Sequence, residues 1–302
     1  MKQQKNYKTG LLLGFGAYLI WGLFPLYWPL LKPANPVEIV SHRAVWSLIT
    51  CLILLAIIKK LKPTFEILKN PKTMFRLLAS TVLISINWLT YIWGVNHNHV
   101  VECALGYYIN PLIVIGFGVI IFKEKMRKLQ WVAVITAAIG VIVLTVDFGR
   151  PPWVSIILAL SWGSYGVVKK QLGIGALEGL TIETLIAFLP YAGYLIFLEG
   201  NHQGQFGHHL GLSTLLFLAG AVTAIPLLMF NGSTNILPFT VIGLLQYITP
   251  TVQFMVGVIV RHEPMPTGRW IGFFIIWIAL IALGTDLVRS GSSMNNRIAE
   301  MD

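Results

Sequence analysis

Long apolar segments alternate with short polar segments along almost the whole chain. A helix of about 20 residues crosses the roughly 30 Å hydrocarbon core of a bilayer, and the segments are close to that length. We predict ten membrane-spanning helices, over residues 10–30, 37–58, 77–95, 101–122, 129–147, 152–168, 180–198, 212–230, 239–260 and 269–288. The first apolar run is too long for a cleaved signal peptide. The pattern therefore predicts an all-α, polytopic membrane protein.

Composition supports a bilayer as the solvent. The chain is 56% hydrophobic and 11% charged, against about 25% charged residues in an ordinary soluble domain. One soluble core of this length cannot hide so many apolar side chains. The net charge of +10 does not indicate nucleic acid, because the basic residues are spread over short loops without aromatic stacking residues between them.

The positions of lysine and arginine predict the orientation. With the N-terminus in the cytoplasm, 17 of the 22 Lys and Arg residues fall on inner segments, 4 fall on outer segments, and Arg43 lies inside a span. Cytoplasmic loops of membrane proteins carry the excess of positive charge. We therefore expect a protein of the cell membrane with both termini in the cytoplasm.

An internal repeat at an offset of 139 residues links the two halves. The segment GYYINPLIVIGFGVIIFKEKM, which starts at Gly106, aligns with LQYITPTVQFMVGVIVRHEPM, which starts at Leu245. Identical residues of the first segment are Tyr108, Ile109, Pro111, Gly118, Val119, Ile120, Glu124 and Met126. Outside these segments, Asn96 matches Asn235 and Trp131 matches Trp270, and the pair Trp21-Gly22 corresponds to Trp162-Gly163 at a slightly different offset.

The repeat predicts the domain organisation. We expect a first five-helix repeat over 1–148, a second over 149–290, and a cytoplasmic tail over 291–302. Because five is an odd number of crossings, the second repeat enters the membrane from the opposite face. Inverted repeats around a site near the middle of the bilayer are common in secondary transporters.

Two prolines inside the repeated segment predict helix breaks. Pro111 and Pro250 lack an N–H group, so each leaves one helical carbonyl without its partner. The polar residues Asn110 and Thr249 stand next to them. Two interpretations remain open, namely a structural kink that Asn110 and Thr249 satisfy themselves, and a pair of breaks that contact a ligand near mid-bilayer.

Six motifs carry a resemblance to a known family. They are AYLIWGLFPLYW (17–28), EIVSHRAVWS (38–47), INWLTYIWGVNHNHVVECALGYYINPL (86–112), SWGSYGVVKK (161–170), IETLIAFLPYAGYL (182–195) and QYITPTVQF (246–254). The chain resembles the EamA branch of the drug/metabolite transporter superfamily, and within it the RarD family, which is named for a chloramphenicol-sensitivity phenotype. The resemblance implies ten helices in two five-helix repeats and carrier-type movement of small molecules. It does not imply a particular substrate.

Arg43 is the most costly residue of the second span. An arginine inside a membrane helix costs about 2.5–3.5 kcal/mol on insertion scales, so it needs a partner or water. Glu102 is the first candidate partner and Glu38 is the second. Arg43 could hold a carboxylate or phosphate group of a substrate, and Glu102 could titrate for proton coupling. Alternatively, the two residues lock the second and fourth helices together.

Aromatic and amide residues away from the span ends suit an apolar cavity with a few polar contacts. The predicted substrate-binding residues are Trp21, Arg43, Asn87, Trp88, Tyr91, Tyr108, Asn110, Trp162, Tyr165, Gln246, Tyr247 and Thr249. We expect no metal or other cofactor, because no carboxylate or cysteine completes a site with the histidines of the outer loops. No GxxxxGK[ST] phosphate loop or soluble nucleotide-binding segment occurs, which argues against ATP-driven pumping by this chain alone.

The expected function is secondary transport by alternating access, with a small organic metabolite or drug-like molecule as the substrate and the lipid bilayer as the other partner. Proton coupling, the direction of transport and the oligomeric state are left open, and a homodimer is compatible with the sequence. The alternatives are a membrane sensor or scaffold without transport and, least favoured, a membrane-embedded enzyme. Glu102 with His42 is the one pair that we identify for catalysis, and it is a poor one.

Overall fold

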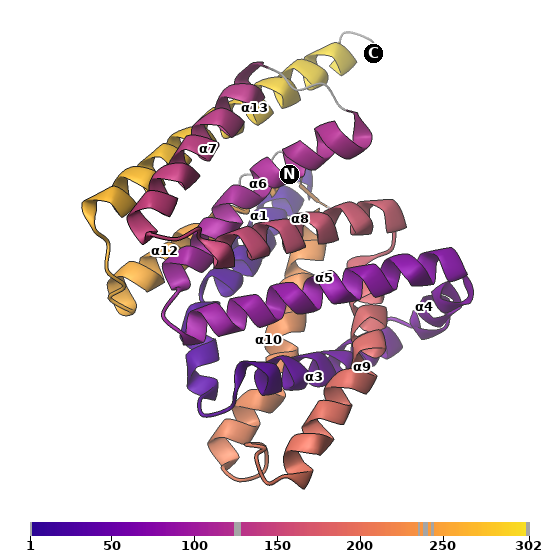
Figure 1. The fold of residues 1–302 in the computed structure, drawn as a ribbon. Coiled ribbons are helices and arrows are strands. Elements are labelled where there is room, and N and C mark those ends of the chain that lie inside the picture. The colour runs from indigo at the N-terminus through magenta and orange to yellow at the C-terminus, as the bar shows by residue number, and fades with distance from the viewer. Residues whose placement is uncertain (1, 124–127, 235, 238–240, 243–244, 300–302) are drawn as a thin grey trace.

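The computed structural model describes residues 2–123, 128–234, 236–237, 241–242 and 245–299, and their side chains except at 2–6, 115, 118, 121, 122, 170 and 286–299. Regular structure in these residues is helical throughout (Figure 1). Its bounds are α1 Lys2–Gly22, α2 Phe24–Tyr27, η1 Trp28–Leu31, α3 Pro36–Ile57, α4 Leu61–Glu66, η2 Ile67–Lys69, α5 Pro71–Asn96, α6 Val100–Phe122, α7 Lys128–Phe148, α8 Trp153–Leu172, α9 Ala176–Gly200, α10 Leu210–Thr234, α12 Ile248–Met255, η3 Val256–Val260 and α13 Thr267–Ala299. Glu124, Met126 and Asn235 of the predicted repeat, and part of the predicted span 239–260, lie outside the described residues.

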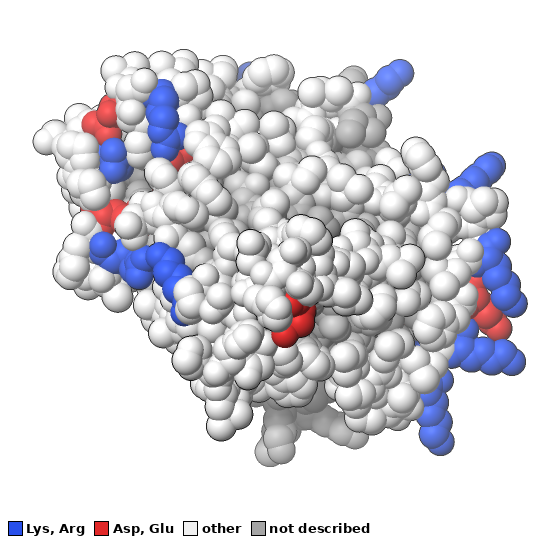
Figure 2. Space-filling model, turned by 60° about the horizontal axis from the view of Figure 1, so that its bottom comes forward, with Lys and Arg blue, Asp and Glu red and all other residues white. Residues whose placement is uncertain are grey.

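Seven helical segments among the described residues are long and apolar enough to cross a membrane. They are Tyr7–Leu31, Pro36–Ile57, Pro71–Asn96, Lys128–Phe148, Ala176–Gly200, Leu210–Thr234 and Thr267–Thr285, and the shorter apolar helices are Val100–Val114, Trp153–Lys169 and Ile248–Val260. Figure 2 shows most charged residues at two opposite ends of one face, with a wide and mostly uncharged zone between them. The protein is thus a polytopic helical membrane protein.

Local sequence signals begin and end several helices. Asn35 precedes Pro36 and accepts a hydrogen bond from the backbone N–H of Glu38 at 2.9 Å, which caps α3. Asn70 precedes Pro71 and caps α5 in the same manner. An asparagine N-cap followed by proline is favourable because the asparagine oxygen accepts from exposed N–H groups of the helix start, and proline has no N–H that needs a partner there.

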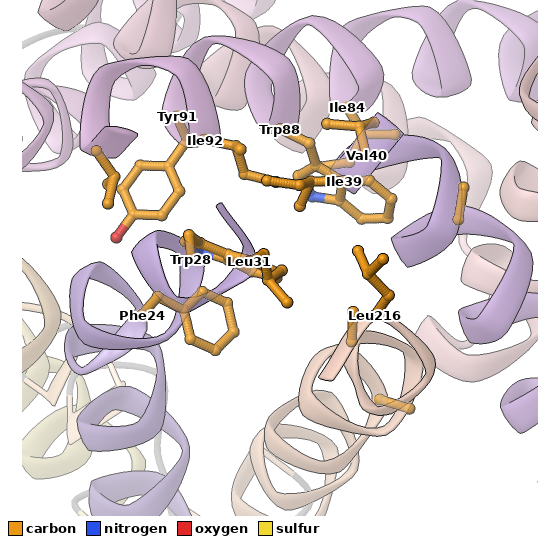
Figure 3. Close-up of a cluster of buried hydrophobic side chains, with 14 of the residues drawn as sticks. Phe24, Trp28, Leu31, Ile39, Val40, Ile84, Trp88, Tyr91, Ile92 and Leu216 are labelled. Carbon is orange, nitrogen blue, oxygen red and sulfur yellow. The ribbon is translucent and has the colours of Figure 1, made fainter. Parts of the chain in front are cut away.

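The helices pack in a few close pairs (Figure 1). Helix α13 lies along α7, α3 lies between α9 and α10, and α8 packs against α5 and α6. Helix α12 contacts α6 and α1, and α1 also packs against α10. One apolar core forms around α2, η1, α3 and α5, where Trp88 and Tyr91 face Phe24 and Trp28 (Figure 3). A second core joins α6, α7, α12 and α13.

The two prolines of the repeat differ in position, although the sequence predicts equivalent breaks. Pro111 lies inside α6, and helical structure continues on both sides of it. Pro250 lies in the first turn of α12, directly after a turn at Gln246 and Tyr247. Proline is well tolerated in the first turn, because the missing N–H has no helical partner there. Only Pro250 therefore marks an interruption of the helix.

Candidate functional site

A cavity of about 510 Å³ lies between the helices. This volume is in the range of small-molecule sites, roughly 300–1,000 Å³. Its wall includes residues of α1, α3, α5, α6, α8, α10 and α12. Of the residues predicted from the sequence, the wall contains Trp21, Arg43, Asn87, Trp88, Tyr91, Asn110, Trp162, Tyr165, Gln246, Thr249 and Pro250.

Tyr108 and Tyr247 do not line this cavity. The hydroxyl of Tyr108 shares a hydrogen bond of 2.9 Å with that of Thr251, and its ring contacts Phe273 and Trp277 in the second core. In both repeats the preceding residue, Tyr107 or Gln246, faces the cavity instead. Successive residues of a helix point about 100° apart, so in α6 Tyr107 faces the cavity and Tyr108 faces the second core. Gln246 and Tyr247 lie in a turn, and there Tyr247 packs against the second core.

Arg43 is 5% exposed and lies against aromatic rings. Its guanidinium carbon is 4.0 Å from the ring centre of Trp88 and 5.0 Å from that of Trp28. Its Nε donates a 3.0 Å hydrogen bond to Oγ1 of Thr223 on α10. Stacking on aromatic faces stabilises a guanidinium, but it does not neutralise the charge.

The predicted ion pair between Arg43 and Glu102 is wrong. Nη2 of Arg150 donates to Oε2 of Glu102 at 2.8 Å, and the backbone N–H of Val154 donates to Oε1 at 3.0 Å. The second candidate, Glu38, accepts a hydrogen bond from the backbone N–H of Gln205. Both carboxylates therefore accept hydrogen bonds from groups of loops and helix starts, where N–H groups lack helical partners. Neither carboxylate contacts Arg43.

A buried polar cluster, which the sequence analysis missed, lies at the cavity wall. Glu183 of α9 is 1% exposed. Its Oε1 accepts hydrogen bonds from Ser80 at 2.7 Å and from Nζ of Lys169 at 3.1 Å, and its Oε2 accepts one from the hydroxyl of Tyr165 at 3.0 Å. Lys169 and Tyr165 line the cavity. An acid within an apolar span is a signal for Glu183, but nothing in the pattern identifies Lys169 as its partner.

Several polar atoms of the wall have no hydrogen-bond partner within the described protein. They are the hydroxyl of Tyr91, Oδ1 of Asn110 and Oε1 of Gln253. Other polar groups of the wall bind the protein itself: Asn87 donates to Ser161 at 3.0 Å, and Thr249 donates to the carbonyl of Tyr18 at 2.7 Å. The wall thus combines fixed polar groups with free ones, as a binding site requires.

Hydrogen bonds join loops to helix ends around the start of α6. Both carboxylate oxygens of Glu263 accept hydrogen bonds at the start of α6, from the N–H groups of Val100 at 2.6 Å and Val101 at 2.9 Å. Burial raises the pKa of Glu263. Burial also lowers the pKa of His99, which lies 3.4 Å from Glu102. In the other direction the cavity reaches Ala176 at the start of α9.

The described residues do not form a group of three or more His, Cys, Asp and Glu side chains that could hold a metal ion. Cys51 and Cys103 are both buried free thiols.

Comparisons with known proteins give one consistent result. The model of the EamA-like transporter family matches residues 8–146 and 152–285. Protein RarD of Streptomyces exfoliatus is 45% identical, over 99% of this chain and 95% of that protein. The uncharacterized transporter YojE of Bacillus subtilis is 40% identical over 92% and 94%, and protein RarD of Escherichia coli is 37% identical over 94% and 96%. A solved crystal structure has the same fold, with a TM-score of 0.62 and 14% identity over 93% of this chain and 98% of that one.

Proposed function

Because the chain belongs to the EamA-like transporter family, we propose that this membrane transporter is a secondary carrier that moves a small organic molecule by alternating access. In this proposal ten spans form two inverted five-helix repeats, and the substrate occupies the central cavity. The observation that carries the proposal is that both halves contribute to the cavity wall at equivalent positions.

The helix packing supports an exchange of the two halves. If each helix of the first half is replaced by its counterpart, the contact of α1 with α10 becomes that of α8 with α5, and the contact of α6 with α8 becomes that of α12 with α1. Contacts α3–α9, α6–α12 and α7–α13 map onto themselves. The cavity wall follows the same rule, since it pairs Trp21 with Trp162, Tyr107 with Gln246 and Asn110 with Thr249.

The positions of the closed and open ends fit one state of a transport cycle. The Glu102–Arg150 pair and the bonds of Glu263 lie at the end that the charge pattern assigns to the outside. The cavity extends the other way, to Lys169, Ile174 and Ala176 near the short loop between α8 and α9, which the same pattern assigns to the cytoplasm. This is the arrangement of an inward-facing carrier in the cell membrane with both termini inside.

The relatives favour transport over the other functions. Several are named transporters, and a further RarD of Pseudomonas aeruginosa carries the name chloramphenicol-sensitive protein. A scaffold or sensor has no need for a cavity of this size, and an enzyme needs reactive groups at one depth. His42 and Glu102, the pair identified for catalysis, do not meet this need, because the carboxylate of Glu102 bonds to Arg150 and Val154.

A test of transport need not assume the substrate. Proteoliposomes with the purified protein would be incubated with a bacterial metabolite extract and washed, and their contents would be identified by mass spectrometry. We expect at least one compound to accumulate above the level in liposomes with heat-inactivated protein, and to exchange with external unlabelled compound. Equal contents in both preparations would overturn the proposed function.

The topology has its own test. Single cysteines at Lys62 and Gly204 would be exposed to a membrane-impermeant thiol reagent in intact cells. Lys62 should be protected and Gly204 should react, because the charge pattern places them on opposite sides. The reverse pattern would overturn the proposed orientation.

A further inference from the structure

Helices α3 and α9, which pack against each other, align at an offset of 140 residues. Glu38 then matches Glu178, and Ser41 matches Thr181. At the position of Arg43 the second half carries Glu183. Equivalent sites of the two halves therefore hold opposite charges.

The two residues also differ in whether a neighbouring side chain balances their charge. Glu183 has its countercharge, because Nζ of Lys169 lies 3.1 Å from its Oε1. The aromatic residues around Arg43 supply no countercharge. At an offset of 141 residues, Phe24 stands at the position of Tyr165, and Trp28 stands at the position of Lys169. Among the described residues, Arg43 contacts no carboxylate, and its two terminal nitrogens donate to no protein group.

The charges at the cavity can be counted. Among the residues whose side chains the structure describes, the wall contains two cations, Arg43 and Lys169. Glu183 offsets the charge of Lys169, which leaves one positive charge on Arg43. A buried cation without a partner is strongly unfavourable, so a ligand that supplies the countercharge is favoured.

We propose that the carrier takes monoanionic organic acids, whose carboxylate binds the guanidinium of Arg43 while their apolar part packs among Trp21, Trp88 and Trp162. This inference rests on the proposed function, since it names the substrate class of the same cavity. The planar guanidinium can donate two parallel hydrogen bonds to a carboxylate, and Thr223 holds it by Nε so that the terminal nitrogens stay free.

A carboxylate fits the cavity better than a phosphate monoester does. A phosphate monoester carries close to two negative charges at neutral pH. Arg43 supplies one positive charge, so the second negative charge would have no partner. A neutral molecule leaves Arg43 unpaired, and a cation adds a like charge. The aromatic wall favours an acid with a ring or another apolar body.

The test uses four probes on one ring system: 1-naphthylacetate, its neutral amide, the cationic 1-naphthylethylamine and 1-naphthyl phosphate. Binding to the purified wild-type protein in detergent would be measured as the concentration-dependent rise in melting temperature. We expect 1-naphthylacetate to bind roughly 10- to 100-fold more tightly than the amide, which is the range for a hydrogen-bonded charged group. We expect the phosphate to bind less tightly than the acid. Equal binding of the acid and the amide would overturn the proposal, and tighter binding of the phosphate would replace the carboxylate by a phosphate.

Variants then assign the anion site to Arg43. Arg43→Gln should remove the preference for the acid over the amide, and Arg43→Lys should keep part of it, because lysine retains the charge but not the paired geometry. Arg76→Gln is the matched control, since Arg76 is an exposed arginine that bonds the carbonyl of Gln171. An unchanged preference in a folded Arg43→Gln protein would overturn the assignment. The comparison of probes on the wild type still decides if that variant fails to fold.

These experiments test the anion site and the carrier function separately. Selective binding of 1-naphthylacetate without accumulation of any compound in proteoliposomes would leave the anion site standing and overturn the carrier. Accumulation of neutral or cationic compounds alone would leave the carrier standing and overturn the anion site.

Discussion

Nη2 of Arg150 lies 2.8 Å from Oε2 of Glu102, and this ion pair joins α6 of the first half to the segment in which the second half begins. The carboxylate is buried, and the arginine side chain is 37% exposed. A pair in this position can hold one end of the cavity closed without filling the cavity itself. It is therefore the first place to test alternating access.

We expect Arg150→Gln to open the outer end more often. A hydrogen bond to a charged group contributes about 1.5–3 kcal/mol, which corresponds to roughly a tenfold or larger shift in an equilibrium. The measurement is the rate at which an impermeant thiol reagent modifies a cysteine at Asn87 in intact cells, in a protein with Cys51 and Cys103 replaced by alanine. The rate should rise roughly tenfold.

Arg261→Gln is the control for this prediction. The charge pattern also assigns Arg261 to an outer loop, but this residue makes an exposed hydrogen bond of 2.9 Å to Asn98. Exposed contacts of this kind contribute little. Its variant should leave the modification rate nearly unchanged. If Arg150→Gln behaves like Arg261→Gln, the ion pair does not control access.

A second prediction concerns the close contact of α3 with α10. A Cβ atom at Gly220 would collide with the backbone carbonyl of Trp46, whereas a Cβ atom at Gly193 of α9 would meet nothing within 4 Å. Gly220→Ala should therefore destabilise the protein by about 1–3 kcal/mol, the usual cost of overpacking. Gly193→Ala should be neutral or stabilise by up to about 1 kcal/mol, because alanine is the better helix former. Melting temperatures in detergent compare the two, and a Gly220→Ala value at or above that of Gly193→Ala would contradict the contact.

A third prediction concerns the pair that the sequence analysis missed. Lys169→Gln leaves the carboxylate of Glu183 buried without its countercharge, so we expect a large loss of stability, up to about 3–5 kcal/mol for a fully buried pair and less here because Lys169 is partly exposed. Replacing both residues by glutamine removes both charges and should restore most of the loss. The measurement is a double-mutant cycle of melting temperatures. Additive losses would mean that Lys169 and Glu183 do not depend on each other.

The helices and the costly residues could be predicted from the sequence because the bilayer imposes them. Hydrocarbon requires long apolar helices, and it makes a charged residue such as Arg43 conspicuous. The central cavity does contain Arg43 and most of the predicted aromatic and amide residues.

Partners and helix rotations could not be predicted, because they depend on how the helices pack. Glu102 binds Arg150, which the sequence places on a loop 48 positions away, rather than an arginine at similar depth. The repeat predicts that Tyr108 and Tyr247 line the cavity, but the residues before them, Tyr107 and Gln246, line it instead. Turning a helix about its axis by about 100°, the angle between successive residues, brings the neighbouring side chain to the cavity. An apolar helix with little amphipathic pattern does not fix that rotation.

The last prediction separates the two prolines of the repeat. Pro111 lies inside α6, so Pro111→Ala restores a helical hydrogen bond and should raise the melting temperature, since an interior proline costs about 3 kcal/mol relative to alanine. Pro250 lies in the first turn of α12, where its missing N–H costs nothing and its fixed φ favours the helix start. Pro250→Ala should therefore leave the melting temperature unchanged or lower it slightly, by up to about 1 kcal/mol of stability.

We expect Pro250→Ala to affect binding and uptake more than Pro111→Ala does. Pro250 lines the cavity and follows the turn at Gln246 and Tyr247, so Pro250→Ala lets the chain there adopt other conformations and should weaken binding of 1-naphthylacetate and slow uptake. Pro111 does not line the cavity, and Pro111→Ala should affect binding less. Binding, uptake and melting temperature would be measured for both variants side by side. If both alanine variants gain the same stability and lose the same affinity, the two prolines act as equivalent helix breaks, and the difference between α6 and α12 has no functional role.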